Sequence, residues 1–286
     1  MNNDLLAIHA KSFHWASVFL SKETYNKCSS LYNFCRTLDD IADDNNDLEV
    51  KKKNFLEFKN NFSNKNFENP IIKNMWNLLE NERISKIVID DLFNGVEGDL
   101  ENEVKINSQK DLLVYCYRVA GTVGLMMAKI FGIKKKESLQ RAIDLGIAMQ
   151  LTNIARDVVE DEKKNRIYLI KNSKDTLLDI KSIISKADSF YDSSFVGIKD
   201  IPFICRFSIV VARRIYRQIG KKILEKKDID SYQKAGKIYV SNFGKIIQTI
   251  FSLLDLIMLF FIRPRKHEKE NEYNLIDEDI GLNERI

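Results

Sequence analysis

The chain contains little proline and little glycine. Its 286 residues include 3 prolines and 11 glycines, whereas average usage would give about 14 and about 20. Because proline breaks helix interiors and glycine weakens them, this composition permits long helices. It excludes collagen-like and low-complexity chains. No segment shows the sustained alternation of a strand, and apolar residues recur at helical spacings of three and four. We therefore expect an all-α protein.

Histidine and cysteine are also scarce. There are three histidines, and the four cysteines have no CxxC spacing, so a zinc site built from these residues is not expected. Buried free thiols and the absence of a signal peptide favour a cytoplasmic protein. The 45 basic and 41 acidic residues are well mixed, so we do not expect a nucleic-acid partner. No GxGxxG motif follows a strand, so no Rossmann-type nicotinamide site is expected.

Two apolar segments each carry one polar stripe at helical spacing. In residues 28–44, the stripe consists of Tyr32, Arg36, Asp39 and Asp43. In residues 145–161, it consists of Gly146, Gln150, Asn153, Asp157 and Asp161. The flanking positions are apolar in both segments. Because burying uncompensated carboxylates is costly, each stripe must face cations, partner charges or a water-filled cavity.

The two aspartate pairs have the spacing of a metal site. Carboxylates four residues apart are separated by about 6 Å along a helix. Mg²⁺ takes one or two carboxylates together with waters and substrate phosphate oxygens. A single DxxxD pair is more often a solvated helix end or the partner of an arginine. Two pairs within apolar helices, each near an arginine (Arg36 and Arg156), instead favour a magnesium–diphosphate site.

A third segment, residues 115–132, places small residues on one helical face. Tyr117, Gly121, Gly124 and Ala128 share this face. Such a stripe either permits close approach of another helix or leaves a groove for an elongated apolar ligand. Together with the diphosphate stripes, it favours the wall of a tunnel for an isoprenoid chain.

The C-terminal part divides in two. Residues 246–262 are nearly all apolar, but they fall short of the roughly 20 residues that span a bilayer, and Asp255 lies near their centre. We expect a terminal helix that packs in the core, with peripheral membrane contact as the alternative. Residues 263–286 are charged, without strong periodicity, and are expected to be a mobile tail. We therefore expect one catalytic domain, residues 1–262, followed by this tail.

Four stretches resemble the squalene and phytoene synthases, and most closely the bacterial phytoene synthases. They are KSFHWAS at residues 11–17, LYNFCRTLDDIADD at 31–44, YCYRVAGTVGLMM at 115–127 and LGIAMQLTNIARDVVEDEKKNRIYL at 145–169. The resemblance implies an isoprenoid-synthase helical bundle around a central apolar cavity. It also implies Mg²⁺, or Mn²⁺ in its place, held by Asp39, Asp43, Asp157 and Asp161.

The resemblance further assigns substrate-binding positions. Arg36, Arg156 and Arg166 match positions that contact diphosphate oxygens, and Tyr115 matches a tyrosine near the reacting carbons. The remaining expected contacts of the substrate are Ser12, Phe13, Tyr32, Gly121, Gln150 and Asn153. The sequence departs from the family at Ile170, where proline is usual. It also departs at residues 237–245, where an arginine-rich motif survives only loosely.

The implied reaction joins two geranylgeranyl diphosphates head to head, giving phytoene through a cyclopropyl diphosphate, the first committed step of carotenoid synthesis. It requires no nicotinamide, although family members that make squalene use NADPH without a Rossmann motif. The first alternative is a C30 squalene or dehydrosqualene synthase using farnesyl diphosphate. The second is a non-catalytic, membrane-associated isoprenoid-binding subunit. The expected partners are isoprenoid diphosphates and downstream carotenoid enzymes, at the inner face of the membrane if contact occurs.

Overall fold

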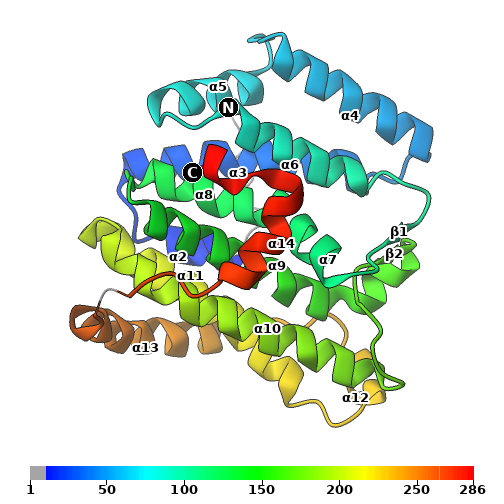
Figure 1. Cartoon of the computed structure of the whole chain (residues 1–286), viewed down its shortest axis with the longest axis vertical. Coiled ribbons are helices and arrows are strands. Elements are labelled where there is room, and N and C mark those ends of the chain that lie inside the picture. Colours follow the sequence, from blue (N-terminus) through cyan, green and yellow to red (C-terminus); the bar gives the residue numbers. More distant parts are fainter. Residues whose placement is uncertain (1–10, 264) are drawn as a thin grey trace.

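A computed structural model describes residues 11–263 and 265–286, with side chains from His14 onward, and it is predominantly helical (Figure 1). Its α-helices are α2 (Lys11–Ser17), α3 (Lys22–Asp43), α4 (Leu48–Ser63), α5 (Pro70–Asn81), α6 (Lys86–Gly98), α7 (Gln109–Cys116), α8 (Thr122–Ile130), α9 (Lys136–Lys163), α10 (Thr176–Gly197), α11 (Phe203–Leu224), α12 (Ile229–Lys234), α13 (Asn242–Phe261) and α14 (Glu270–Ile280). The prediction of an all-α fold is confirmed.

Several helices begin at residues whose side chains cap them. Asn69 accepts hydrogen bonds from the backbone N–H groups of Ile71 and Ile72, and Pro70 occupies the first turn of α5. Asp228 and Ser231 form a reciprocal capping box at the start of α12. The few prolines and capping residues therefore separate long uninterrupted helices.

The layer formed by α3 to α6 is held by an aromatic core. The ring of Phe34 in α3 lies 5.3 Å from that of Phe62 and 5.8 Å from that of Phe93, measured between centroids. All three side chains are fully buried. Aromatic pairs at these separations contribute about 0.5–1.5 kcal/mol each beyond their buried area. This packing anchors α3, the helix with the first aspartate pair.

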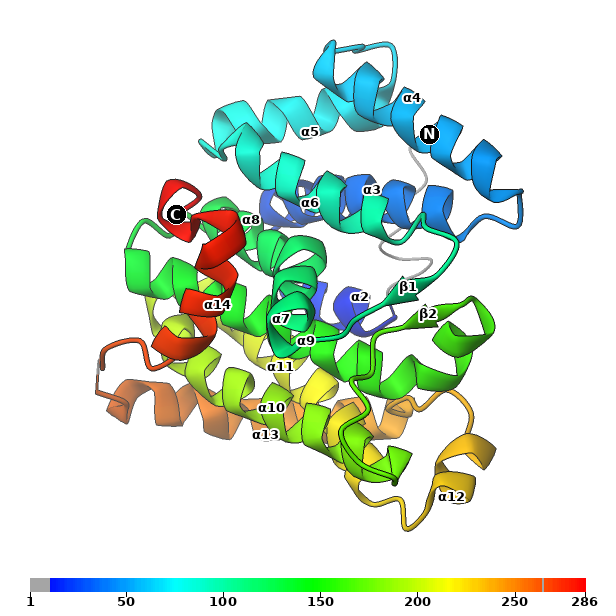
Figure 2. The same cartoon turned by 45° about the vertical axis from the view of Figure 1, so that its right-hand side comes forward.

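Helix α9 lies in the interior and packs against α7, α8, α10 and α11 (Figures 1 and 2). Its contact with α8 depends on Gly124 and Gly146. A Cβ atom at Gly146 would lie 2.2 Å from the carbonyl oxygen of Ala120, and one at Gly124 would lie 2.2 Å from that of Ala142. Both glycines therefore permit two helix backbones to meet, and α9 presents the second aspartate pair from a tightly held position.

Two short strands join distant parts of the chain. β1 (Val104–Lys105) pairs in parallel with β2 (Arg166–Ile167), so that Val104 lies opposite Arg166. The pairing links the segment after α6 to the segment after α9, at one end of the bundle (Figure 2). A π-helical turn, Tyr117–Gly121, joins α7 to α8; such turns are frequent at functional sites.

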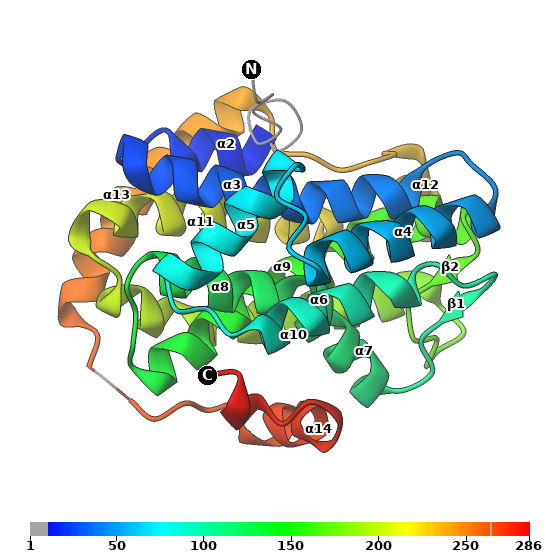
Figure 3. The same cartoon turned by 90° about the horizontal axis from the view of Figure 1, so that it is seen from above.

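Helix α13 lies at the edge of the molecule in all three views (Figures 1–3). It packs on α11, but only Lys245, Ser252, Asp255 and Leu259 are buried. The expectation that its apolar residues pack in the core is therefore wrong. It is one of two stretches in the described chain long and apolar enough to cross a membrane; the other, Gln109–Ile130, is an interior segment with more than half of its residues buried.

The charged C-terminal segment contains α14, and this corrects the expectation of a mobile tail. Tyr273, Ile276 and Ile280 recur at helical spacing and are buried, and α14 packs on α7. Arg285 donates to both carboxylate oxygens of Asp91 at 2.9 and 3.3 Å. The prediction failed because many charged residues surround this short apolar stripe.

Candidate active site

The first aspartate pair lies on the C-terminal half of α3. Asp39 and Asp43 follow Arg36 along the helix, as the spacing predicts. The Arg36 guanidinium contacts Asp40 at 2.6 Å, and its buried Nε has no hydrogen-bond partner. That unused donor is suited to an anionic oxygen, because guanidinium groups bind phosphates through several N–H groups at once. Tyr32, one turn earlier, is half-buried, and burial raises its pKa to about 12.

The second pair lies at the C-terminal end of α9. Arg156 donates to both oxygens of Asp157, at 2.8 Å from Nε and 2.5 Å from Nη2. Lys237 also approaches Asp157, at 3.5 Å. Lys237 belongs to the loosely preserved motif of residues 237–245, and the structure places this lysine beside the second aspartate pair.

Asn153 and Gln150 lie on the same face, one and two turns before Asp157. The Asn153 amide donates to Gln150 Oε1 at 3.3 Å. Its buried Oδ1 has no partner, although buried acceptors are nearly always satisfied. The helix therefore presents an unused amide oxygen in line with two carboxylates.

Arg166, at the start of β2, binds the first aspartate pair from the segment that follows the second. Its Nη1 donates to Asp43 Oδ1 at 2.7 Å, and its Nη2 donates to the carbonyl oxygens of Ala42 and Asp99. Lys164 Nζ lies 3.1 Å from Asp43 Oδ2. The end of α3 is thereby held against the segment that follows α9, which brings together motifs far apart in the sequence.

Asp99 is a third acidic position that the sequence analysis missed. The hydroxyl of Tyr115 donates to its Oδ2 at 3.1 Å, and that of Tyr168 donates to its Oδ1 at 2.6 Å. The rings of Tyr115 and Tyr168 are stacked, with centroids 4.7 Å apart. Asp99 is the C-cap of α6 and belongs to no polar stripe, so periodicity gave no signal for it.

The carboxyl groups of the site differ in how they are compensated. Burial raises the pKa of Asp39 to about 7, and the nearby carboxylates of Asp43 and Asp99 add to the rise. Burial and the charge of Asp157 raise the pKa of Asp161 to about 7. Burial alone would raise the pKa of Asp43, but hydrogen bonding to Arg166 lowers it below its ordinary value. Neither Asp39 nor Asp161 makes a direct ion pair like that of Asp43 with Arg166, although the Arg36 charge opposes the rise at Asp39 and the Arg166 charge opposes it at Asp161.

Burial also raises the pKa of Asp99, to about 6, against the opposing effect of its two tyrosine hydrogen bonds. Asp43 and Asp99 act on Asp39, while Asp99 and Asp157 act on Asp161. One region thus collects negative charge from α3, α6 and α9. Such a region would gain from binding a multivalent cation.

Gly121 does not have the environment that we expected. It is buried, and a Cβ atom there would lie 3.0 Å from Tyr117 Cδ2 and 3.1 Å from Ile143 Cγ2. Together with Gly124, it serves the close packing of α9 rather than an open groove. The tunnel-wall interpretation of this small-residue stripe is therefore corrected. Ser12 and Phe13 lie outside the residues whose side chains are described.

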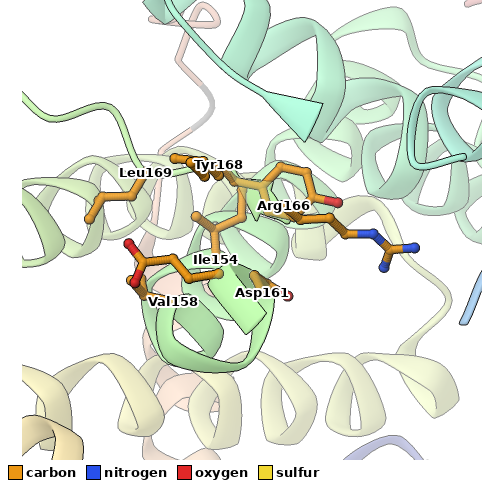
Figure 4. A pocket seen from close by; sticks show the side chains of 8 residues that line it. Ile154, Val158, Asp161, Arg166, Tyr168 and Leu169 are labelled. Carbon is orange, nitrogen blue, oxygen red and sulfur yellow. The ribbon is translucent and has the colours of Figure 1, made fainter. Parts of the chain in front are cut away.

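A small hollow lies beside Asp161 and Arg166 (Figure 4). Its other walls include Ile154, Val158 and Leu169, on the flank of the polar stripe. Its cavity volume of about 10 Å³ is far below the roughly 300–1,000 Å³ of ordinary ligand sites. This hollow is therefore not the central apolar cavity that we predicted.

The site contains the types of oxygen ligand that a divalent cation prefers, but they are not already gathered into a cluster. Among the described residues, no three acidic, histidine or cysteine side chains converge closely enough to hold a metal ion. However, Asp39 and Asp161 have raised pKa values, and Asn153 Oδ1 is unpartnered. Carboxylate and amide oxygens are the ligands that Mg²⁺ accepts.

An all-helical fold with an aspartate pair and an arginine on each of two helices fits a synthase of the prenyltransferase type. The squalene/phytoene synthase family model matches residues 6–171, which include both aspartate pairs. The chain belongs to this family.

Similar proteins include two bacterial 15-cis-phytoene synthases. The one from Enterobacter agglomerans is 31% identical over 77% of this chain and 84% of its own length. The one from Pantoea ananas is 29% identical over 77% and 80%. Among solved structures, a dehydrosqualene synthase in complex with a ligand is 28% identical, with a TM-score of 0.71 over 89% of this chain and 94% of that chain.

Proposed function

We propose that this protein is a Mg²⁺-dependent phytoene synthase that joins two geranylgeranyl diphosphates head to head. The observation that carries the proposal is the convergence of Asp43, Arg166 and Asp99 with Tyr115 at the ends of α3 and α9. The names of the bacterial relatives support the C40 product. The reaction consumes two geranylgeranyl diphosphates and yields the hydrocarbon, two inorganic diphosphates and two protons, one lost on forming the cyclopropyl diphosphate and one in the last step.

Asp39, Asp43, Asp157 and Asp161 would hold Mg²⁺, with Asn153 Oδ1 as a further oxygen beside the second pair. When bound, Mg²⁺ supplies positive charge to the departing diphosphate. Mn²⁺ would serve in its place, because it prefers the same oxygen ligands.

The arginines of the chain would bind diphosphate oxygens directly. Arg166 and Arg156 are paired with carboxylates in this structure, and Arg36 has an unused buried Nε. Cation binding at the carboxylates would free the first two guanidinium groups for substrate. The diphosphate would then be held by forked donors aimed where negative charge develops, which lowers the barrier to its departure.

Tyr115 and Tyr168 would act on the allylic cation left behind. Their stacked rings offer π faces that attract a cation, and Asp99 fixes both hydroxyl groups. The cation would require an apolar surrounding, since water would convert it to an alcohol. Inorganic diphosphate still held by the arginines would accept the proton lost in the last step.

The C30 alternative is supported by the similarity to the dehydrosqualene synthase structure. In that case the same residues would act on farnesyl diphosphate. The length of the chain-binding space separates the two substrates, and product mass decides between them.

The proposal is tested by replacing one carboxylate in each pair. Asp39→Asn and Asp157→Asn should each lower turnover by orders of magnitude while the helical circular dichroism is unchanged. Asp44→Asn and Glu162→Gln are matched controls, because each is an acidic residue next in sequence to a pair but lies outside the polar stripes. Unchanged turnover in both pair variants would refute the assignment of the metal ligands. We also propose that the enzyme acts in the cytoplasm and passes its product to downstream carotenoid enzymes.

A further inference from the structure

Helix α13 buries its polar side chains and exposes its apolar ones. Its buried face carries Lys245, Ser252 and Asp255 with only one apolar residue, Leu259. Its outer face is apolar, and its most exposed members are Phe261 (80%) and Phe243 (72%). The other apolar residues of that face are Ile246, Ile250, Phe251, Leu253, Leu254, Ile257, Met258 and Phe260. A surface helix of a globular protein normally has the opposite arrangement.

The buried side of α13 is held by specific polar contacts. Arg214 of α11 donates to both oxygens of Asp255, at 2.5 and 2.8 Å, and to Gln248 at 3.3 Å. The indole of Trp15 donates to Thr249 at 2.9 Å. Rotating α13 or lifting it off would leave the Arg214 and Asp255 charges unpaired, which strongly disfavours either movement because both charges are partly or fully buried. The apolar face is therefore held outward.

The apolar surface continues from α13 onto the start of α11. The Phe203 ring lies 6.4 Å from the Phe260 ring. Phe203 and its neighbour Ile204 are 65% and 66% exposed. We call the exposed apolar residues of α13, together with Phe203 and Ile204, the apolar platform. Contiguous exposed apolar surface of this kind marks an interaction site.

Basic side chains border one end of the platform. Arg206 lies over the Phe203 ring at 5.8 Å, and Lys199 donates to the carbonyl oxygen of Ile262 at the end of α13. Arg263 and Lys266 follow and are exposed. The acidic groups nearby are already engaged: Asp200 with Lys135 and Ser138, Glu268 with Arg265, and Asp255 with Arg214.

We propose that the apolar platform docks on an anionic lipid bilayer, with α13 lying in the plane of the membrane. The apolar side chains enter the boundary between headgroups and acyl chains, and the basic border meets lipid phosphates. A membrane-spanning arrangement would remove Asp255 from Arg214, so the helix lies on the bilayer rather than across it. An isologous dimer through the same face would bring two copies of the basic border to one interface. Charge therefore favours the bilayer as the occupant.

Docking on a bilayer would suit an enzyme whose product is insoluble in water. This benefit rests on the hydrocarbon synthesis proposed above. The docking itself does not depend on that proposal, because it follows from the platform and its basic border. A binding experiment without substrate therefore tests it separately.

The test is flotation of the purified full chain with vesicles of pure phosphatidylcholine or of phosphatidylcholine with 30% phosphatidylglycerol. We expect binding to both, and stronger binding to the anionic vesicles. The pair Leu254→Glu with Ile257→Glu should lower vesicle binding at least 10-fold. Leu178→Glu on α10 is the matched control, because Leu178 is 57% exposed and Ile257 is 55% exposed; it should bind as the wild type does.

The basic border is tested by Arg263→Gln with Lys266→Gln. At about 1 kcal/mol for each basic residue near an anionic surface, this pair should weaken binding to anionic vesicles about 10- to 30-fold. Binding to neutral vesicles should be unchanged. Far-ultraviolet circular dichroism and turnover in detergent micelles establish that each variant is folded.

Absence of vesicle binding by the wild type would overturn the proposal. So would an equal loss of binding in Leu178→Glu. A wild-type dimer that the Leu254 and Ile257 substitutions convert to a monomer, without any vesicle binding, would instead identify a second copy of the chain as the occupant. If vesicles bind but no hydrocarbon forms in micelles, the function proposed above fails while the docking surface stands.

Discussion

Arg166 donates a hydrogen bond to Asp43 across 2.7 Å, joining the segment after α9 to the end of α3. The two residues belong to different motifs, 123 positions apart. In this structure the arginine neutralises a carboxylate that we assign to the metal site. The pair therefore keeps the two motifs in register before substrate and cation bind.

Arg166→Gln should lower kcat/KM about 100-fold, the order found when one donor to a developing anion is removed. Arg166→Lys should recover only part of this loss, because lysine lacks the forked donors of the guanidinium. Steady-state kinetics with purified enzyme measures both. Arg217→Gln is the matched control, since Arg217 pairs with Asp188 and Asp192 away from the site. Equal losses in the two glutamine variants would contradict a diphosphate role for Arg166.

Asp99→Asn should lower kcat about 10-fold with little change in KM, because it weakens the hydrogen bonds that position Tyr115 and Tyr168 and leaves the diphosphate contacts in place. The substitution preserves size, so the melting temperature should move little. Asp90→Asn, in the first half of the same helix and paired with Lys86, is the control. A rise in KM with unchanged kcat would show that Asp99 acts on substrate binding instead.

The raised pKa values predict how pH acts on the metal-free protein. Asp39 titrates near pH 7 in the folded chain and near pH 4 when unfolded. Its stabilising contribution is therefore present below about pH 4 and is lost as pH rises through about 7. The melting temperature of Asp39→Asn relative to wild type should rise between pH 5 and pH 8 in EDTA. Asp43 has a lowered pKa, so its ionised form stabilises the fold above about pH 4. That contribution is lost only as the pH falls below about 4, outside the range of this experiment. A difference that does not vary with pH would contradict the raised pKa of Asp39.

The C-terminal segment should contribute strongly to stability. Arg285 and Asp91 form a buried pair, and Tyr117 donates to the same carboxylate. Arg285→Ala should lower the free energy of unfolding by about 3 kcal/mol, because it leaves Asp91 buried and uncompensated. Arg265→Ala, which removes an exposed pair with Glu268, should cost less than about 1 kcal/mol. Urea denaturation measures the free energy of unfolding of both variants. Equally small losses in Arg285→Ala and Arg265→Ala would indicate that residues 265–286 are loosely attached.

Periodicity predicted what depends on local pattern. The helices bearing Asp39, Asp43, Asp157 and Asp161 are present, and Arg156 and Arg166 lie with them. Contacts made across the fold gave no local signal: Asp99 accepts a hydrogen bond from Tyr168, 69 positions away, beside the pairing of β1 with β2. The outward face of α13 was also not predictable, because composition alone does not reveal that Asp255 faces Arg214. Gly121 shows the same limit, since close packing and a ligand groove select the same small residue.

The chain length of the product tests the central claim most directly. Purified enzyme with Mg²⁺ is given geranylgeranyl diphosphate or farnesyl diphosphate in separate reactions, without NADPH, and the extracted hydrocarbon is weighed by mass spectrometry. We predict that geranylgeranyl diphosphate gives a C40 hydrocarbon with the mass of phytoene. EDTA and the Asp157→Asn substitution should each abolish its formation. A C30 hydrocarbon from farnesyl diphosphate, with no C40 product, would contradict the account.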